Sequence, residues 1–131
     1  MQPVPLLRIN LSAAVPAYQQ IADGLRALLV AGEFEPGDQL PTVRQLAMDL
    51  GVHHNTVAEA YRRLAGEGWL DLKRRRGAIV VARAGAKSNP KARADFAKRL
   101  KELAAKAVTE GVSENAIARE LQSLAEAFSK E

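Results

Sequence analysis

The chain has 131 residues, a formal net charge of +4 at pH 7, 47% hydrophobic residues and only 5% aromatic residues. It contains no cysteine, which excludes a disulfide scaffold, thiolate catalysis and a cysteine-ligated zinc site. No apolar run approaches the roughly 20 residues that span a bilayer, and residues 1–11 lack the pattern of a secretory signal. We therefore expect a soluble, cytoplasmic protein without a membrane partner.

The N-terminal part of the chain predicts one amphipathic helix. Alternating Leu7, Ile9 and Leu11 indicate a short extended segment before it. Pro16 suits the first turn of a helix, because the N–H that proline lacks would have no partner there, and Gly32 suits the helix end. Apolar residues recur between them in steps of three and four and form the expected buried face: Tyr18, Ile21, Ala22, Leu25, Leu28 and Leu29.

Two further helices joined by a glycine turn are predicted over residues 42–66. Thr42 and Gln45 have the spacing of a capping box, Gly51 ends the first of these helices, and the next begins between His53 and Asn55. Such a pair is the helix-turn-helix pattern, although any three-helix protein can show the same spacing. The residues expected to pack in the core are Val43, Leu46, Ala47, Leu50, Val57, Ala60, Tyr61 and Leu64, together with Met48 and Trp69.

A β-hairpin with a basic loop is predicted directly after the helix-turn-helix. Its strands are residues 69–72 and 78–81, and Lys73 to Gly77 form the loop between them. A basic run alone is equally typical of a solvated surface loop. Placed after a helix-turn-helix, it favours a wing that contacts DNA phosphates.

The C-terminal part predicts two helices that dimerise. Residues 84–90 have the composition of a linker, and Ser113 is a good N-cap for a second helix after the break at Gly111. Two amphipathic helices bury little by themselves, and a second copy would complete a four-helix arrangement. The alternative is that the pair packs back on the N-terminal domain. The expected dimer contacts are Phe96, Leu100, Leu103, Ile117, Leu121, Leu124 and Phe128.

The predicted fold class is therefore mainly α with a small β-hairpin. We expect a winged helix-turn-helix domain over residues 1–83, a linker over residues 84–90 and a helical dimerisation element over residues 91–131.

Residues 16–26, 32–47 and 51–70 together resemble the DNA-binding domain of the GntR family, and the resemblance extends over residues 16–82. Most members carry a large C-terminal effector domain, whereas 48 residues follow position 83 here. A short helical tail of this kind is similar to that of the YtrA subfamily, whose members are dimers that often control transport genes. The resemblance implies a homodimeric regulator, a repressor in our interpretation, that binds an inverted repeat in double-stranded DNA.

The expected DNA contacts follow from the pattern and the resemblance. The start of the second helix of a helix-turn-helix enters the major groove, which places four residues near bases or phosphates, although capping and solvation would also explain them: His53, His54, Asn55 and Thr56. The resemblance implies a base contact for Arg44, a phosphate contact for Arg62 or Arg63, and wing contacts for Arg74, Arg75, Arg76 and Gly77. Many members carry a basic residue where Ala58 stands, so their base preference cannot be transferred.

Other functions have less support in the sequence. His53 and His54 are adjacent, so on a helix their side chains would point about 100° apart, and no third metal ligand follows in pattern. We expect neither an enzyme, nor a metal sensor, nor a cofactor. The alternative function is an interaction module that uses the winged-helix fold for protein contacts. A small-molecule effector of unknown identity remains compatible with the sequence, although a two-helix tail offers little enclosed volume.

Overall fold

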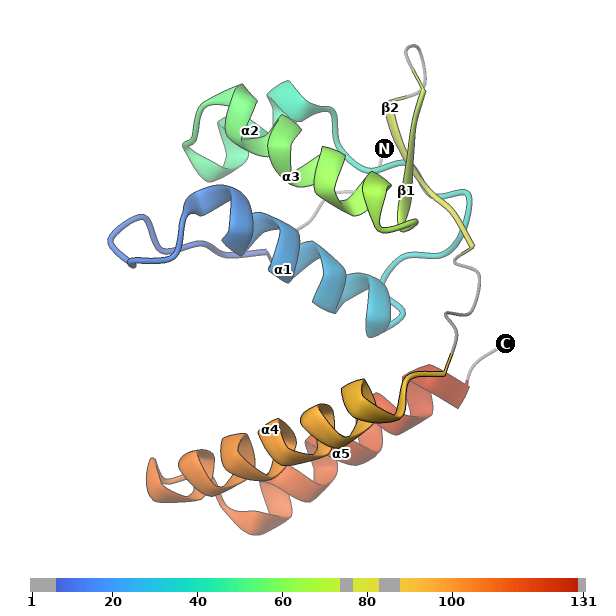
Figure 1. Ribbon diagram of the computed structural model, residues 1–131. Coiled ribbons are helices and arrows are strands. Elements are labelled where there is room, and N and C mark those ends of the chain that lie inside the picture. Colours follow the sequence, from blue (N-terminus) through green and yellow to red (C-terminus); the bar gives the residue numbers. More distant parts are fainter. Residues whose placement is uncertain (1–6, 74–76, 83–87, 130–131) are drawn as a thin grey trace. The chain divides into compact units, whose positions relative to one another are not determined.

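The computed structural model describes residues 7–73, 77–82 and 88–129. The chain divides into two units, Met1–Ala84 and Gly85–Glu131, and each is described by itself. The expected contacts Arg74, Arg75 and Arg76, and most of the expected linker, lie outside the described residues. The elements are α1 (Ala17–Val30), α2 (Val43–Leu50), α3 (His54–Gly66), β1 (Leu70–Lys73), β2 (Gly77–Val80), α4 (Pro90–Thr109) and α5 (Glu114–Ser129), labelled in Figure 1.

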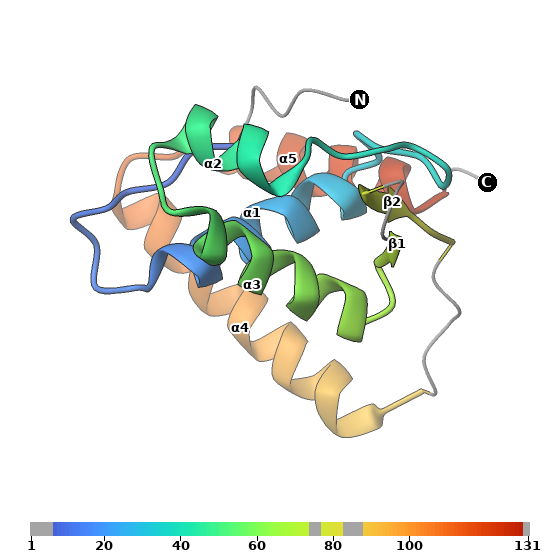
Figure 2. The ribbon, with the colours of Figure 1, turned by 90° about the horizontal axis from the view of Figure 1, so that it is seen from above.

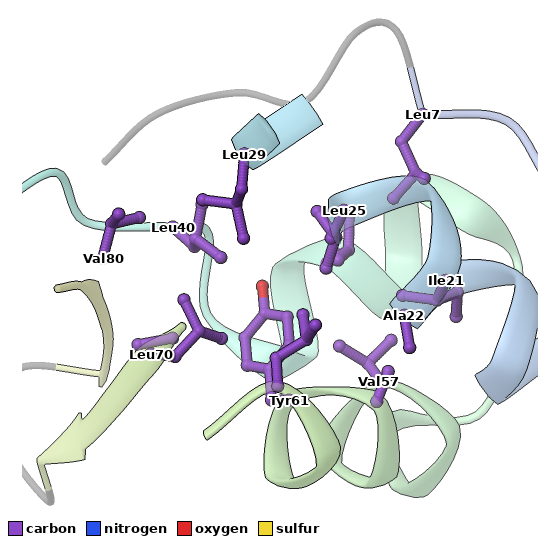
Figure 3. Packing of buried hydrophobic residues seen from close by; sticks show 14 of the residues in the cluster. Leu7, Ile21, Ala22, Leu25, Leu29, Leu40, Val57, Tyr61, Leu70 and Val80 are labelled. Atoms are coloured by element: carbon purple, nitrogen blue, oxygen red, sulfur yellow. The ribbon is translucent and has the colours of Figure 1, made fainter. Parts of the chain in front are cut away.

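The first unit has one core that α1, α2, α3 and the hairpin share. The predicted buried faces are confirmed for α1 and α3, and Figure 3 shows Tyr61 of α3 among Leu25, Leu40 and Leu70. The Tyr61 hydroxyl donates a hydrogen bond of 2.7 Å to the carbonyl oxygen of Pro41, and burial raises the pKa of this phenol. The core therefore connects α3 directly to the segment that leads into α2.

One residue assigned to the core lies on the surface. Met48 is 76% exposed, whereas Leu46 and Ala47 of the same helix are buried. Successive helical residues are about 100° apart around the axis, so a two-turn helix with Leu46 and Ala47 turned inward directs Met48 toward solvent. The assignment of Met48 to packing was wrong, while Trp69 does pack against the core.

An ion pair joins the middle of α1 to the end of α3. Arg26 donates to both carboxylate oxygens of Glu67, at 2.8 and 2.9 Å, and also to Asp23 at 2.9 Å. The hydrogen bond to Glu67 is the main cause that raises the pKa of Arg26. A bidentate contact of this kind fixes the relative position of α1 and α3 better than a single exposed ion pair does.

The hairpin has a third hydrogen-bonded neighbour that the sequence did not predict. β1 and β2 pair antiparallel, with Leu70 opposite Val80 and Lys73 opposite Gly77. On the other edge of β2, the N–H of Gly37 donates to the Val80 carbonyl at 2.7 Å, and that of Leu40 to the Ala78 carbonyl at 2.9 Å. The segment between α1 and α2 therefore holds the base of the wing.

Two local predictions differ from the structure. Thr42 caps α2 by accepting a hydrogen bond from the Gln45 N–H at 3.1 Å, but the Gln45 amide nitrogen donates to Asp49 at 2.9 Å, so the capping box is realised only in its first half. The alternation predicted near the N-terminus is present for Leu7 and Ile9, which pack in or against the core, but it ends before Leu11. The chain turns after Asn10, whose side chain accepts from the Ser12 N–H at 2.9 Å, and this turn leaves Leu11 in solvent.

The second unit consists of α4 and α5, which meet at a tight turn. Gly111 has a φ of 100°, and Ser113 caps α5, as predicted, by accepting from the Ala116 N–H at 3.1 Å. The two helices diverge away from this turn (Figure 2), so the hairpin is open. Neither helix contains a buried residue. No helix of the described ranges is long and apolar enough to cross a membrane.

Candidate nucleic-acid interface

The turn between α2 and α3 brings the two helices close together. Gly51 has a φ of 71°, the left-handed conformation that favours glycine, and the N–H of Val52 donates to the Ala47 carbonyl at 3.0 Å. Ala47 is buried at the crossing, where a larger side chain would separate the helices. The predicted helix-turn-helix is therefore present.

The N-terminus of α3 is organised by two histidines. His53 is the N-cap in extended backbone conformation, and its Nδ1 accepts a hydrogen bond of 3.1 Å from the Asn55 N–H. The ring of His54 stacks on that of His53, with centroids 4.3 Å apart and planes 29° apart. The expectation that the two side chains diverge was wrong, because His53 lies before the helix and does not follow helical geometry.

The four expected contacts at this helix start differ in exposure. His53 and Asn55 are exposed, whereas His54 and Thr56 are half-buried. Because Nδ1 of His53 accepts a hydrogen bond, the neutral imidazole carries its proton on Nε2. His53 therefore presents a donor to any ligand, while the amide of Asn55 offers both a donor and an acceptor.

Arg62 and Arg63 lie on different sides of α3. Both contact Glu59, Arg62 at 2.9 Å and Arg63 at 3.6 Å. Arg63 also stacks over the Tyr18 ring, 4.6 Å from its centroid, and so lies on the side of α3 that faces α1. The hydrogen bond from Arg62 is the main cause that lowers the pKa of Glu59. Of the two arginines, only Arg62 borders the hollow described next.

A hollow of about 620 Å³ lies between the start of α2, one side of α3 and the loop end of the two wing strands. Arg44, in the first turn of α2, is exposed, and so is Arg62, so the two cations stand on the border of the same hollow. The lining residues are Gln39, Thr42, Val43, Arg44, Ala58, Tyr61, Arg62, Leu72, Gly77 and Ala78. The structure thus brings together Arg44, Arg62 and Gly77, which the sequence placed in separate elements.

Gln39 and Leu72 are lining residues that the sequence did not single out. Gln39 forms an isolated antiparallel bridge with Ile79 of β2. Its side-chain nitrogen lies close to Gly77, since any larger residue at position 77 would place its Cβ 3.5 Å from this atom. Leu72 points away from the core and is 41% exposed. No sequence pattern indicated that Leu72 or Gln39 lines the hollow.

The expected dimer residues fall into two groups. Leu100, Leu103, Ile117 and Leu121 border a second hollow of about 230 Å³ near the turn between α4 and α5. Phe96, Leu124 and Phe128 do not border it, and the two phenylalanines are 59% and 69% exposed. Val108 and Val112 add exposed apolar surface that the spacing did not indicate.

Comparison with known proteins identifies the first unit. The family model "Bacterial regulatory proteins, gntR family" matches residues 17–80. The solved structure of YtrA from Sulfolobus acidocaldarius, a GntR-family transcription factor, is 32% identical and has a TM-score of 0.56. It covers 79% of this chain, and the match includes 97% of that protein. The chain belongs to the GntR family. Its helix-turn-helix and wing are the DNA-binding domain of the GntR family.

Two further relatives extend the comparison. The transcriptional repressor YtrA of Bacillus subtilis (strain 168) is 36% identical over 75 residues, which are 57% of this chain and 58% of that protein. The match thus spans less than two thirds of that relative. The transcriptional antiterminator from Listeria monocytogenes EGD-e has a TM-score of 0.58 at 28% identity, over 93% of this chain and 88% of that one. At 93% coverage, the likeness to this structure extends into the C-terminal helices of the chain.

Proposed function

We propose that this protein is a transcription regulator that binds an inverted-repeat operator as a homodimer and represses the genes beside it. The observation that carries the proposal is the exposed face of α3. Asn55, Ala58 and Arg62 follow one another at three- and four-residue steps, so they share one side of the helix, and Arg44 borders the same hollow as the last two.

This face has the chemistry that reads a base sequence. A helix with its side chains is about 10–12 Å wide and fits the major groove. The Arg44 guanidinium matches the two acceptors of guanine, the Asn55 amide matches adenine, and Nε2–H of His53 donates to an acceptor on a base or a phosphate. Arg62 supplies a phosphate contact. The wing supplies others in the proposal, through Gly77 at the loop end of β2 and through Arg74, Arg75 and Arg76.

The sign of regulation follows the relative in Bacillus subtilis, which is named a repressor. A dimer bound across a promoter would exclude the polymerase, and regulation of this kind takes place in the cytoplasm. Transporter genes are the proposed targets, because the chain is similar to regulators named YtrA and members of that subfamily often control transport genes. The proposal includes a small-molecule effector of unknown identity.

The open hairpin of α4 and α5 supports dimerisation. A unit of this size rarely forms a stable core alone, and here neither helix buries a residue. The charges of the helices also differ: α4 carries six basic and two acidic residues, while α5 carries one basic and three acidic residues. We propose that α4 of one copy packs against α5 of the other, so that the apolar stripes cover each other and the charges complement each other.

Selection of duplexes from a random pool tests the function. At roughly 150 mM salt, where non-specific phosphate contacts are weakened, the protein should enrich an inverted repeat whose half-sites are about 10 base pairs apart or a multiple of that spacing. A variant with Arg44→Ala and Asn55→Ala, which are both exposed, serves as a folded control and should enrich nothing. If the unchanged protein also enriches nothing while it remains folded, the protein-interaction alternative takes precedence.

A further inference from the structure

The hollow beside α3 is charged at its border and apolar inside. Arg44 and Arg62 line it and are exposed, and Val43, Ala58 and Leu72 contribute apolar surface to the same lining. Leu72 of β1 is 41% exposed although it is apolar. An anionic ligand that also carries an apolar group would satisfy both features.

We infer that Ala58 contacts the 5-methyl group of a thymine in the operator, next to the base that Arg44 binds. The inference rests on the proposed function and specifies which base the hollow selects. The thymine methyl is the apolar group that base edges display in the major groove. It is also the group that an alanine side chain, which has no donor or acceptor, recognises there.

The position of Ala58 on α3 supports this contact. It lies four residues after His54 and four before Arg62, so it belongs to the same side of the helix as the residues that enter the groove. Its side chain is half-buried, which leaves part of the methyl accessible. A short side chain also lets the helix axis approach the base edges more closely than a long one does.

The neighbouring arginines restrict where the thymine lies. Arg62 is held at 2.9 Å by Glu59, one turn away on the same helix, and so is directed along α3. Arg44 belongs to α2 and lines the same hollow as Ala58 and Arg62. The apolar contact should therefore fall close to both cations, within one or two base pairs of the guanine proposed for Arg44.

Deoxyuridine substitution tests the inference directly, because deoxyuridine pairs as thymidine does and lacks only the methyl group. Each thymine of one half-site of the selected operator is replaced in turn, and affinity is measured by fluorescence anisotropy. For the unchanged protein, one replacement should weaken binding about fourfold, the effect of one methyl-sized group leaving a contact. The other thymines should tolerate replacement.

Protein variants then assign the methyl contact to Ala58. In the Ala58→Gly variant, deoxyuridine at the thymine identified in this way should no longer weaken binding. In the Ala58→Ser variant, which avoids the flexibility of glycine, most of the fourfold loss of affinity should disappear as well. Ala27→Gly, at an exposed position of α1, is the matched control, because it lowers helix stability by the same amount. In this variant, deoxyuridine should still weaken binding fourfold.

The outcomes separate this inference from the proposed function. An operator in which every thymine tolerates deoxyuridine overturns the inference and leaves the proposed function intact. The same holds if the sensitive thymine remains equally sensitive with both Ala58→Gly and Ala58→Ser. A pool from which no sequence is enriched overturns the proposed function and the inference with it.

Discussion

The Nδ1 atom of His53 accepts a hydrogen bond of 3.1 Å from the backbone N–H of Asn55. One side chain at the proposed DNA interface thus has a structural task as well, because it satisfies an amide at the start of α3 that has no partner within the helix. Substitutions at His53 can separate the two tasks.

Replacing His53 with alanine should lower the free energy of unfolding by about 1 kcal/mol, the usual cost of losing an N-cap. His53→Ser replaces the accepting Nδ1 with a capping hydroxyl oxygen and should restore most of the stability without restoring the imidazole donor. Urea unfolding measures the first effect and operator affinity the second. Equal stability of the alanine variant and the unchanged protein would show that the cap contributes nothing.

Arg44→Ala should weaken specific binding far more than non-specific binding. The expected loss is about 1–3 kcal/mol for the operator, the value of a two-pronged contact with a base. Titrations with the operator and with an unrelated duplex make the comparison, and Arg44→Lys, which keeps the charge without the fork, should lose nearly as much specificity. A uniform loss on both duplexes would make Arg44 a phosphate contact.

Glu59→Gln should strengthen non-specific DNA binding. The carboxylate holds Arg62 at 2.9 Å and Arg63 at 3.6 Å, so its removal frees Arg62 for a phosphate. The slope of log affinity against log salt should become steeper by about one phosphate contact. The pair is exposed, and stability should change little. An unchanged slope would mean that Arg62 already leaves Glu59 in the complex.

Leu121→Lys with Leu124→Lys should convert the dimer to a monomer in sedimentation velocity. Both leucines lie on the apolar side of α5, about 40% exposed in the single chain, and a dimer would have to bury the two new charges. Gln122→Lys with Ser123→Lys adds the same charge to exposed positions between them and should leave the dimer intact. A dimeric leucine variant would place the interface elsewhere.

Tyr61→Phe should remove part of the loss of stability at alkaline pH. Burial raises the pKa of Tyr61 above its usual value near 10. The contribution of Tyr61 to the free energy of unfolding is therefore complete below pH 10. It falls as the pH rises above this value, because the tyrosine ionises first in the unfolded state. At pH 7 the variant should be about 1–3 kcal/mol less stable, since the Pro41 carbonyl loses its donor. Urea unfolding at pH 7 and above pH 10 measures both effects.

Much of the first unit could be predicted from local patterns. The buried sides of α1 and α3 follow from apolar residues at helical spacing, and the turn follows from Gly51, whose positive φ glycine adopts readily. Met48 was assigned wrongly because periodicity in an eight-residue helix leaves the direction of the core uncertain. The stacking of His53 on His54 depends on one N-cap backbone conformation that no residue pattern specifies.

The features that the sequence did not predict are non-local. The bridge between Gln39 and Ile79 joins residues 40 positions apart, and no local pattern indicates that these two residues pair. The open angle between α4 and α5 is equally unpredictable. Apolar residues spaced by three and four positions along each helix fit a closed hairpin as well as an exchange of helices between two copies. Spacing identifies an apolar side of a helix, and the partner that covers this side is determined by tertiary or quaternary packing.

β2 is hydrogen bonded on both edges, to β1 and to the segment before α2. Main-chain bonds therefore fix the base of the wing to the segment that leads into α2 and the helix-turn-helix, irrespective of which side chains contact DNA. The number of base pairs between the major-groove contact and the wing contact should then be constant when interface residues are exchanged. New base preferences could be introduced at positions such as Ala58 without altering the length of the half-site.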